Sequence, residues 1–194
     1  KLGGATASYN GQTTTTLAAS LVAGNTIYHK AAGQTWNEAV TLSVSCTSTS
    51  PCIVEGYNAT RGDYPLEALR PTNARAGGAG IGITIRGNNY LLKHLIVSGA
   101  ASTGLSATLN GVVFINVRST GNGLEGFKGT SSNVFLQCEA DLNTTAGLRL
   151  TSSANTVAYC NLHNNTTQGL LIDSANANFV VGNLIVNNAS HGVS

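Results

Sequence analysis

A five-residue motif, asparagine and glycine separated by three residues, recurs at a nearly constant spacing along the second half of the chain. Successive copies lie 21, 22 and 23 residues apart: Asn122/Gly126, Asn143/Gly147, Asn165/Gly169 and Asn188/Gly192. A repeat of this length is too short for a strand–helix–strand unit, which needs about 30 residues or more. It fits a coil of two or three short strands joined by turns, in which equivalent positions of successive coils stack about 4.8 Å apart.

The residues after each glycine alternate between apolar and polar types, which is typical of a strand with one buried face. The predicted inward residues are Leu105, Ala107, Phe127, Gly129, Leu148, Leu150, Leu170 and Ile172. The predicted outward residues are Ser106, Thr108, Lys128, Thr130, Arg149, Thr151, Leu171 and Asp173. A second strand is expected in each coil, over 113–117, 134–140, 157–162 and 179–186.

These patterns predict an all-β protein, a right-handed single-stranded parallel β-helix with about 22 residues per coil. Residues 14–23 are predicted to form a short capping helix that ends at Gly24. The 194 residues are expected to form a single β-helix domain. Within it, 1–25 is the N-terminal cap, 26–98 holds irregular coils, and 99–194 holds regular coils that are expected to continue beyond Ser194.

The repeated asparagines are predicted to form a ladder, because each side-chain amide can bond the equivalent amides of the coils above and below. The glycine four residues later is expected to let the backbone leave the corner without strain.

The four cysteines form two pairs of different kinds. Cys138 and Cys160 are 22 residues apart, so they are expected to stack as small buried residues. Cys46 and Cys52 flank a short loop, where either a disulfide or two unlinked thiols would fit.

Composition excludes two classes of partner. Only 9% of residues are charged, the net charge is +2, and no run of Lys or Arg occurs, which argues against nucleic acid. No segment approaches 18 consecutive apolar residues, so no membrane span is expected. Low surface charge and an unfinished last coil predict a homo-oligomer, or a larger assembly, formed through the open C-terminal end.

The N-terminal half resembles the opening of pectate-lyase-like β-helix proteins. The resemblance rests on the predicted helix, on residues 23–30 (AGNTIYHK) and on residues 51–63 (PCIVEGYNATRGD). The version with Gly56, Tyr57, Thr60, Gly62 and Asp63 is similar to β-helix proteins encoded by environmental bacteriophages. Proteins of this kind include lyases, hydrolases, tailspikes and inert virion parts, so the resemblance implies the fold and a location that is extracellular or on a virion surface.

Pectate-lyase-type catalysis would imply several Asp ligands for Ca²⁺ beside an Arg or Lys base on one outer face. The first sheet offers Lys128, Arg149 and Asp173. Lys128 and Arg149 stack on adjacent coils, either as a basic spot that contacts an acidic sugar or as two solvated side chains. Glu139 and Asp141 share a parity on the second strand, where they could hold a cation or form an acid/base pair. No metal site or cofactor is predicted. Binding of Ca²⁺ is possible, but the sequence shows no set of ligands that supports it.

A polygalacturonase-like hydrolase would carry an Asp-Asp pair and a Gly-His-Gly, whereas this chain has no Asp-Asp and only Ser190-His191-Gly192. The sequence therefore favours a non-catalytic structural or surface module of a virion or extracellular assembly. Its polar face would bind a glycan with the help of scattered aromatic residues: Tyr9, Tyr28, Trp36, Tyr57, Tyr64 and Tyr90. The alternative is a polysaccharide lyase or glycoside hydrolase of the tailspike depolymerase type.

Overall fold

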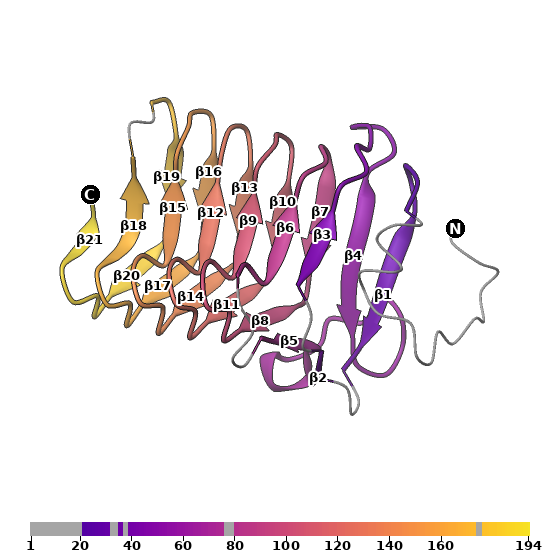
Figure 1. Ribbon diagram of the computed structural model, residues 1–194, viewed down its shortest axis with the longest axis horizontal. Coiled ribbons are helices and arrows are strands. Elements are labelled where there is room, and N and C mark those ends of the chain that lie inside the picture. Colours follow the sequence, from indigo (N-terminus) through magenta and orange to yellow (C-terminus); the bar gives the residue numbers. More distant parts are fainter. Residues whose placement is uncertain (1–20, 32–34, 37–38, 76–79, 174–175) are drawn as a thin grey trace.

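The chain forms a solenoid of three parallel seven-stranded sheets (Figure 1). The computed structural model describes residues 21–31, 35–36, 39–75, 80–173 and 176–194. Sheet A contains, in spatial order, β1 (Thr26–Lys30), β4 (Cys52–Tyr57), β7 (Tyr90–Lys93), β10 (Val113–Ile115), β13 (Val134–Leu136), β16 (Thr156–Ala158) and β19 (Phe179–Val181). Sheet B contains β2 (Thr35–Trp36), β5 (Thr72–Ala74), β8 (Ile96–Ser98), β11 (Arg118–Thr120), β14 (Glu139–Asp141), β17 (Asn161–His163) and β20 (Leu184–Val186). Sheet C contains β3 (Val40–Leu42), β6 (Ile83–Ile85), β9 (Leu105–Ala107), β12 (Phe127–Gly129), β15 (Leu148–Leu150), β18 (Gln168–Ile172) and β21 (His191–Val193).

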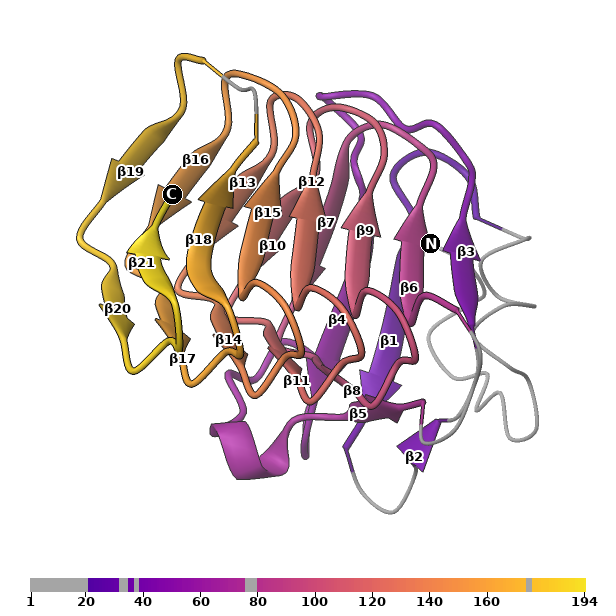
Figure 2. The ribbon, with the colours of Figure 1, turned by 60° about the vertical axis from the view of Figure 1, so that its left-hand side comes forward.

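Each coil passes through sheets A, B and C in turn, so every strand between the first and last of its sheet pairs with the strands of the coils before and after it. Leu105 pairs with Phe127, Phe127 with Leu148, and Leu148 with Leu170. These pairs confirm the predicted parallel β-helix and its repeat of about 22 residues. Figure 2 shows the strands of sheet C side by side along the solenoid.

The second strand predicted for each regular coil is in fact two strands. Strands β13 and β14, for example, are separated by Gln137 and Cys138, and the φ of Gln137 is 53°. Asn116, Tyr159 and Gly182 hold the same left-handed conformation at the equivalent place in their coils. The period-two pattern predicts strand on both sides of this residue, but it does not mark a single-residue turn. The chain therefore bends there from sheet A to sheet B.

The interior is filled by columns of apolar side chains from all three sheets. The predicted inward residues from Leu105 to Leu170 are buried, and Ile172 is partly buried against the core. Phe114 and Phe135 stack with ring centroids 5.0 Å apart, and Phe127 meets both rings edge-on. Burying one large apolar side chain stabilises the fold by about 1.5–3 kcal/mol, so these columns supply the main favourable term.

The predicted asparagine ladder is present at the corner between sheets B and C. The side-chain amide of Asn122 donates to Oδ1 of Asn143 at 2.9 Å, that of Asn143 to Asn165 at 2.9 Å, and that of Asn165 to Asn188 at 3.0 Å. Each Oδ1 also accepts the backbone N–H of the preceding ladder residue. The first three members are buried, so the ladder satisfies polar groups that water does not reach.

The glycines of the motif are needed for space. Gly126, Gly147 and Gly169 do not have positive φ, which corrects the expectation that they relieve backbone strain. A Cβ at these positions would lie 2.7, 2.8 and 2.6 Å from the ladder amide nitrogen of the next coil. The ladder therefore excludes any larger side chain there.

A second asparagine ladder, which the sequence analysis missed, lies at the corner between sheets C and A. In this ladder, too, the side-chain Oδ1 accepts a backbone N–H from the preceding coil. Oδ1 of Asn133 accepts from Val112, Oδ1 of Asn155 from Asn133, and Oδ1 of Asn178 from Asn155, at 2.9–3.0 Å. Two of the three corners of each regular coil are thus fixed by side-chain amides.

Most of the predicted capping helix, 14–23, lies outside the described residues, and its last three residues are not helical. The helix is therefore not supported. No α-helix occurs in the described ranges, and no helix there is long and apolar enough to cross a membrane.

The cysteines have two distinct states. Cys46 and Cys52 form a disulfide, which resolves the alternative that the sequence left open. Cys138 and Cys160 are buried free thiols on adjacent coils, as expected.

Between β4 and β5 the chain leaves the solenoid over residues 58–71, a segment called the excursion below. Its first part is an ordered loop. The Asp63 carboxylate accepts the backbone N–H groups of Asn58, Ala59 and Thr60. The 3-10 helix η1 (Glu67–Leu69) follows, and the chain then enters β5. Figure 2 shows this excursion projecting beyond the strands of sheet B.

Candidate functional site

The outer face of sheet C carries the basic pair that the sequence predicts. Lys128 on β12 lies directly beside Arg149 on β15, and both side chains are half-buried. Thr84 and Ser106 occupy the same column in the two preceding coils. The next column of sheet C consists of Arg86, Thr108, Thr130, Thr151 and Asp173. Ser106, although predicted to point outward, is buried, and Leu171 lies beside Arg149 in the first column. The face therefore combines threonine hydroxyl groups with three cations, one carboxylate and one leucine.

Arg149 is held between two carboxylates. Its Nη2 donates to Asp173 at 2.6 Å and its Nη1 to Glu125 at 3.2 Å. These hydrogen bonds raise the pKa of the Arg149 guanidinium. The two hydrogen bonds fix the orientation of the guanidinium, whereas the guanidinium of a lone surface arginine would be free to move.

Glu125 reaches this site from the corner between sheets B and C. It is buried, and Thr103 Oγ1 donates to its Oε2 at 2.8 Å. Burial alone would raise the pKa of Glu125, but the hydrogen bonds from Thr103, its own backbone and Arg149 lower it overall. The carboxylate is therefore ionised and serves as an anchor for Arg149.

Lys128 is the more available of the two cations. Among the residues that the structure describes, none forms an ion pair with its ammonium group. Since Lys128 and Arg149 project from adjacent strands, an anion on this face can contact both.

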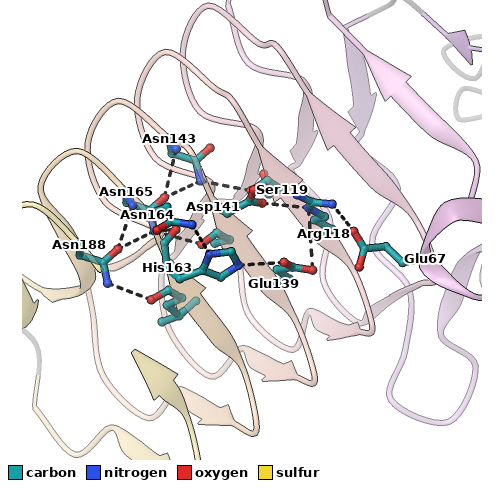
Figure 3. Close-up of polar contacts among 12 residues, drawn as sticks. Glu67, Arg118, Ser119, Glu139, Asp141, Asn143, His163, Asn164, Asn165 and Asn188 are labelled. Atoms are coloured by element: carbon teal, nitrogen blue, oxygen red, sulfur yellow. Dashed lines mark hydrogen bonds and ion pairs between the residues drawn. The ribbon is translucent and has the colours of Figure 1, made fainter. Parts of the chain in front are cut away.

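The outer face of sheet B holds a separate charged cluster, shown in Figure 3, which is centred on Arg118. The guanidinium donates to both carboxylate oxygens of Asp141, at 2.9 and 2.7 Å, and lies 3.8 Å from Glu139 Oε2. It also pairs with Glu67 of the excursion. The hydrogen bonds to Asp141 raise the pKa of Arg118. Glu139 and Asp141 are thus brought together, but as partners of an arginine.

His163 extends this cluster toward the C-terminus (Figure 3). The Asn164 amide donates to its Nδ1 at 2.8 Å, so the ring carries its hydrogen on Nε2 and donates it to Glu139 Oε1 at 2.9 Å. Both ring nitrogens are occupied, which leaves neither free to act as a base.

Calcium does not fit either cluster. Within the described ranges, no group of three or more His, Cys, Asp or Glu side chains is placed to hold a metal ion. Glu125 and Asp173 are both engaged by Arg149, and Glu139 and Asp141 by Arg118. Calcium prefers six to eight oxygen ligands, which these pairs do not supply.

The aromatic residues proposed for glycan contact differ in exposure. Tyr90 is buried in the core, whereas Tyr64 is 82% exposed. Tyr28 meets Tyr57 edge-on and is covered by the Arg61 guanidinium, 5.0 Å from its ring centre. Tyr9 and the side chain of Trp36 lie outside the described part of the chain.

Five residues of the two clusters were missed from the sequence: Thr103, Glu125, Arg118, His163 and Glu67. The repeat contains a signal for two of them, because Arg118 precedes Glu139 by 21 residues and His163 follows Asp141 by 22. The other three lie in corners or in the excursion, where strand parity gives no direction for a side chain.

The stacked sheets and polar outer faces define the class of parallel β-helix proteins. The family model described as "Right handed beta helix region" matches residues 72–194. This match covers more than half of the chain, and the chain belongs to that family. The solenoid is therefore right-handed, as predicted. No curated protein matches the sequence.

Two solved structures align with this chain. A pectate lyase, Pel9A, aligns with a TM-score of 0.61 at 16% identity, over 81% of this chain and 44% of that chain. This chain thus spans less than half the length of that lyase. An alginate lyase from Paenibacillus sp. str. FPU-7 aligns with a TM-score of 0.43 at 11% identity, over 93% of this chain and 95% of that chain. At such identities the likeness concerns the fold alone.

Proposed function

We propose that the outer face of sheet C binds an acidic polysaccharide and that the chain cleaves it by elimination, as a lyase. The observation that carries the proposal is the pair of adjacent cations, Lys128 and Arg149, on a face where most of the other outward residues carry hydroxyl groups. Similarity in fold to a pectate lyase supports it. The sheet B cluster is less suitable, because three carboxylates surround its one arginine and would repel a polyanion.

The chemistry would use two groups. Arg149 pairs with the carboxylate of a uronate residue, which acidifies the neighbouring C5–H bond. Lys128, in its neutral form, takes the C5 proton. The C5 electron pair forms a double bond with C4, the C4–O bond breaks, and the leaving oxygen takes a proton from water. Glu125 and Asp173 hold the Arg149 guanidinium in place throughout.

A second candidate is the non-catalytic glycan-binding module that the sequence favoured. It is supported by the two carboxylates that partly neutralise Arg149 and by the misfit to calcium. In that case sheet C would hold the glycan without cleaving it.

Location and assembly are proposed on separate grounds. The Cys46–Cys52 disulfide supports an oxidising, extracellular setting, and the placement on a virion surface rests on the resemblance. Exposed apolar side chains on the last coil, among them Phe179, Leu184 and Val193, support self-association through that end. Light scattering coupled to size exclusion tests the oligomer.

The deciding experiment incubates the protein with polygalacturonate and with alginate, and follows the ultraviolet absorbance of the unsaturated product. Lys128→Gln should lower kcat by about a hundredfold or more, the usual loss for a proton-transfer group, while binding persists. Arg149→Gln should lower both binding and turnover. Lys30→Gln, an exposed lysine on sheet A, is the matched control and should change neither.

The outcomes separate the two candidates. Absence of an absorbing product with binding that depends on Arg149 would refute the lyase and support the binding module. Absence of binding to any acidic polysaccharide would refute both.

A further inference from the structure

The corner between sheets A and B carries an unusual column of side chains. His94, Asn116, Gln137 and Tyr159 each follow the last residue of a sheet A strand, and those last residues pair in register from coil to coil. All four have φ between 53° and 58°. Their side chains therefore repeat along one edge of the solenoid at the coil spacing of about 4.8 Å.

A non-glycine residue in the left-handed conformation at this corner points to a role for its side chain. Gly182 occupies the same corner in the next coil, and glycine adopts this conformation without a steric penalty. Gln137 and Tyr159 adopt the same conformation although their Cβ atoms make it unfavourable. Backbone strain of this kind tends to be kept where a side chain has a function.

Two exposed tyrosines lie on this edge. Tyr159 is 63% exposed, and its ring lies over Gly182, where a Cβ would come within 2.7 Å of the ring carbons. Tyr64, on the excursion, packs edge-to-face against the His94 ring with centroids 5.1 Å apart, and it stays 82% exposed. Three coil steps of about 4.8 Å separate His94 from Tyr159, about 14 Å in all.

Partly buried polar contacts fix the His94 ring against which Tyr64 packs. Arg70 Nη2 donates to Asn116 Oδ1 at 2.6 Å, and the Asn116 amide donates to Nδ1 of His94 at 3.1 Å. His94 is buried, and this burial lowers its pKa, which keeps the ring neutral and able to accept that bond. Within the described residues, one N–H of the Asn116 side-chain amide and the exposed side-chain amide of Gln137 form no hydrogen bond, while the Gln137 backbone N–H donates to the Ala158 carbonyl.

We propose that Tyr64, Asn116, Gln137 and Tyr159 form a second glycan-binding site, the corner strip, which binds an extended uncharged polysaccharide along the solenoid axis. The two tyrosine rings stack on sugar rings at either end, since a fixed Tyr offers a large amphipathic surface at a low entropy cost. The amides of Asn116 and Gln137 hydrogen-bond the hydroxyl groups of the sugars between them. The strip lacks a charged side chain of its own, which distinguishes its ligand from the acidic one proposed for sheet C.

The test measures binding of cellohexaose and xylohexaose to the full chain by titration calorimetry, with pull-down on insoluble cellulose as a second readout. Tyr64→Ala and Tyr159→Ala should each weaken binding about tenfold, the usual size of one aromatic stacking contact. Tyr64→Phe and Tyr159→Phe keep the rings and should bind nearly as the wild type does. Phe179→Ala removes an exposed aromatic residue outside the strip and should leave binding unchanged.

The result is independent of the sheet C proposal, because binding of polygalacturonate should be unaffected in all these variants. The corner strip is refuted if the wild type binds neither oligosaccharide. It is equally refuted if the two alanine variants bind as tightly as the Phe179→Ala control.

Discussion

Removing one rung of the asparagine ladder should destabilise the whole solenoid. The Asn143 side chain is fully buried and takes part in four hydrogen bonds: two received from Asn122, and one donated to each of Ser119 and Asn165. Asn143→Ala removes all four and leaves the buried backbone N–H of Asn122 without an acceptor.

The size of the effect follows from these contacts. A buried polar group left unpaired costs about 1–3 kcal/mol, and the Asn122 amide keeps a bond to Ser119 Oγ. We expect a loss of about 3 kcal/mol, which for a chain of this length corresponds to a fall in Tm of about 10 °C. Thermal unfolding followed by far-ultraviolet circular dichroism measures it.

Asn176→Ala is the matched control, because the Asn176 side chain is exposed. It should melt within about 1 °C of the wild type, since surface substitutions usually change stability by less than 0.5 kcal/mol. Equal melting temperatures for the two variants would refute the view that the ladder holds the corner.

Three further predictions concern stability. Gly147→Ala should lower the free energy of unfolding by about 1–3 kcal/mol in urea titrations, because the new Cβ would lie 2.8 Å from the Asn165 amide; an unchanged midpoint would contradict the space requirement. Reduction of the Cys46–Cys52 disulfide, whose cysteines are six positions apart, should cost about 2 kcal/mol, and melting with and without reductant measures this loss, which the double alanine variant should reproduce. Burial lowers the pKa of His29 from 6.5 to about 3, so only the unfolded chain takes up this proton between these values, and stability should fall as pH falls through that window. A His29→Leu variant with the same pH slope as the wild type would show that another group is responsible.

The repeat predicted the architecture because a solenoid relates distant positions by one fixed step. Asn122 and Asn143 could be placed in contact from their spacing alone, and so could Lys128 and Arg149. The second ladder obeys the same step, but Asn133 and Asn155 are followed four residues later by Gln137 and Tyr159 in place of the glycine that drew attention to the first. The single-residue turn at Gln137 escaped prediction because glutamine is not typical of the left-handed conformation.

The sites were less predictable than the fold for a physical reason. Strand parity assigns Lys128 and Glu139 to outer faces, but it gives no direction to Glu125, which lies in a corner and reaches Arg149 across it. Glu67 meets Arg118 only because the excursion folds back over sheet B. The carboxylates that pair with Arg149 and Arg118 therefore come partly from corners and from the excursion, where the sequence has no period-two alternation to predict side-chain direction.

Because the strands of each regular coil pair with the strands of the coils directly before and after it, a regular coil is a unit that could be inserted or removed whole. The residue steps of 21, 22 and 23 between ladder asparagines show that the corners absorb an extra residue while the strands stay aligned. Duplicating one coil would place a copy of its outward side chains one spacing further along the same face. A β-helix of this kind can thus lengthen a binding surface in regular increments. The apolar side chains of the added coil would pack in the same columns as those of its neighbours.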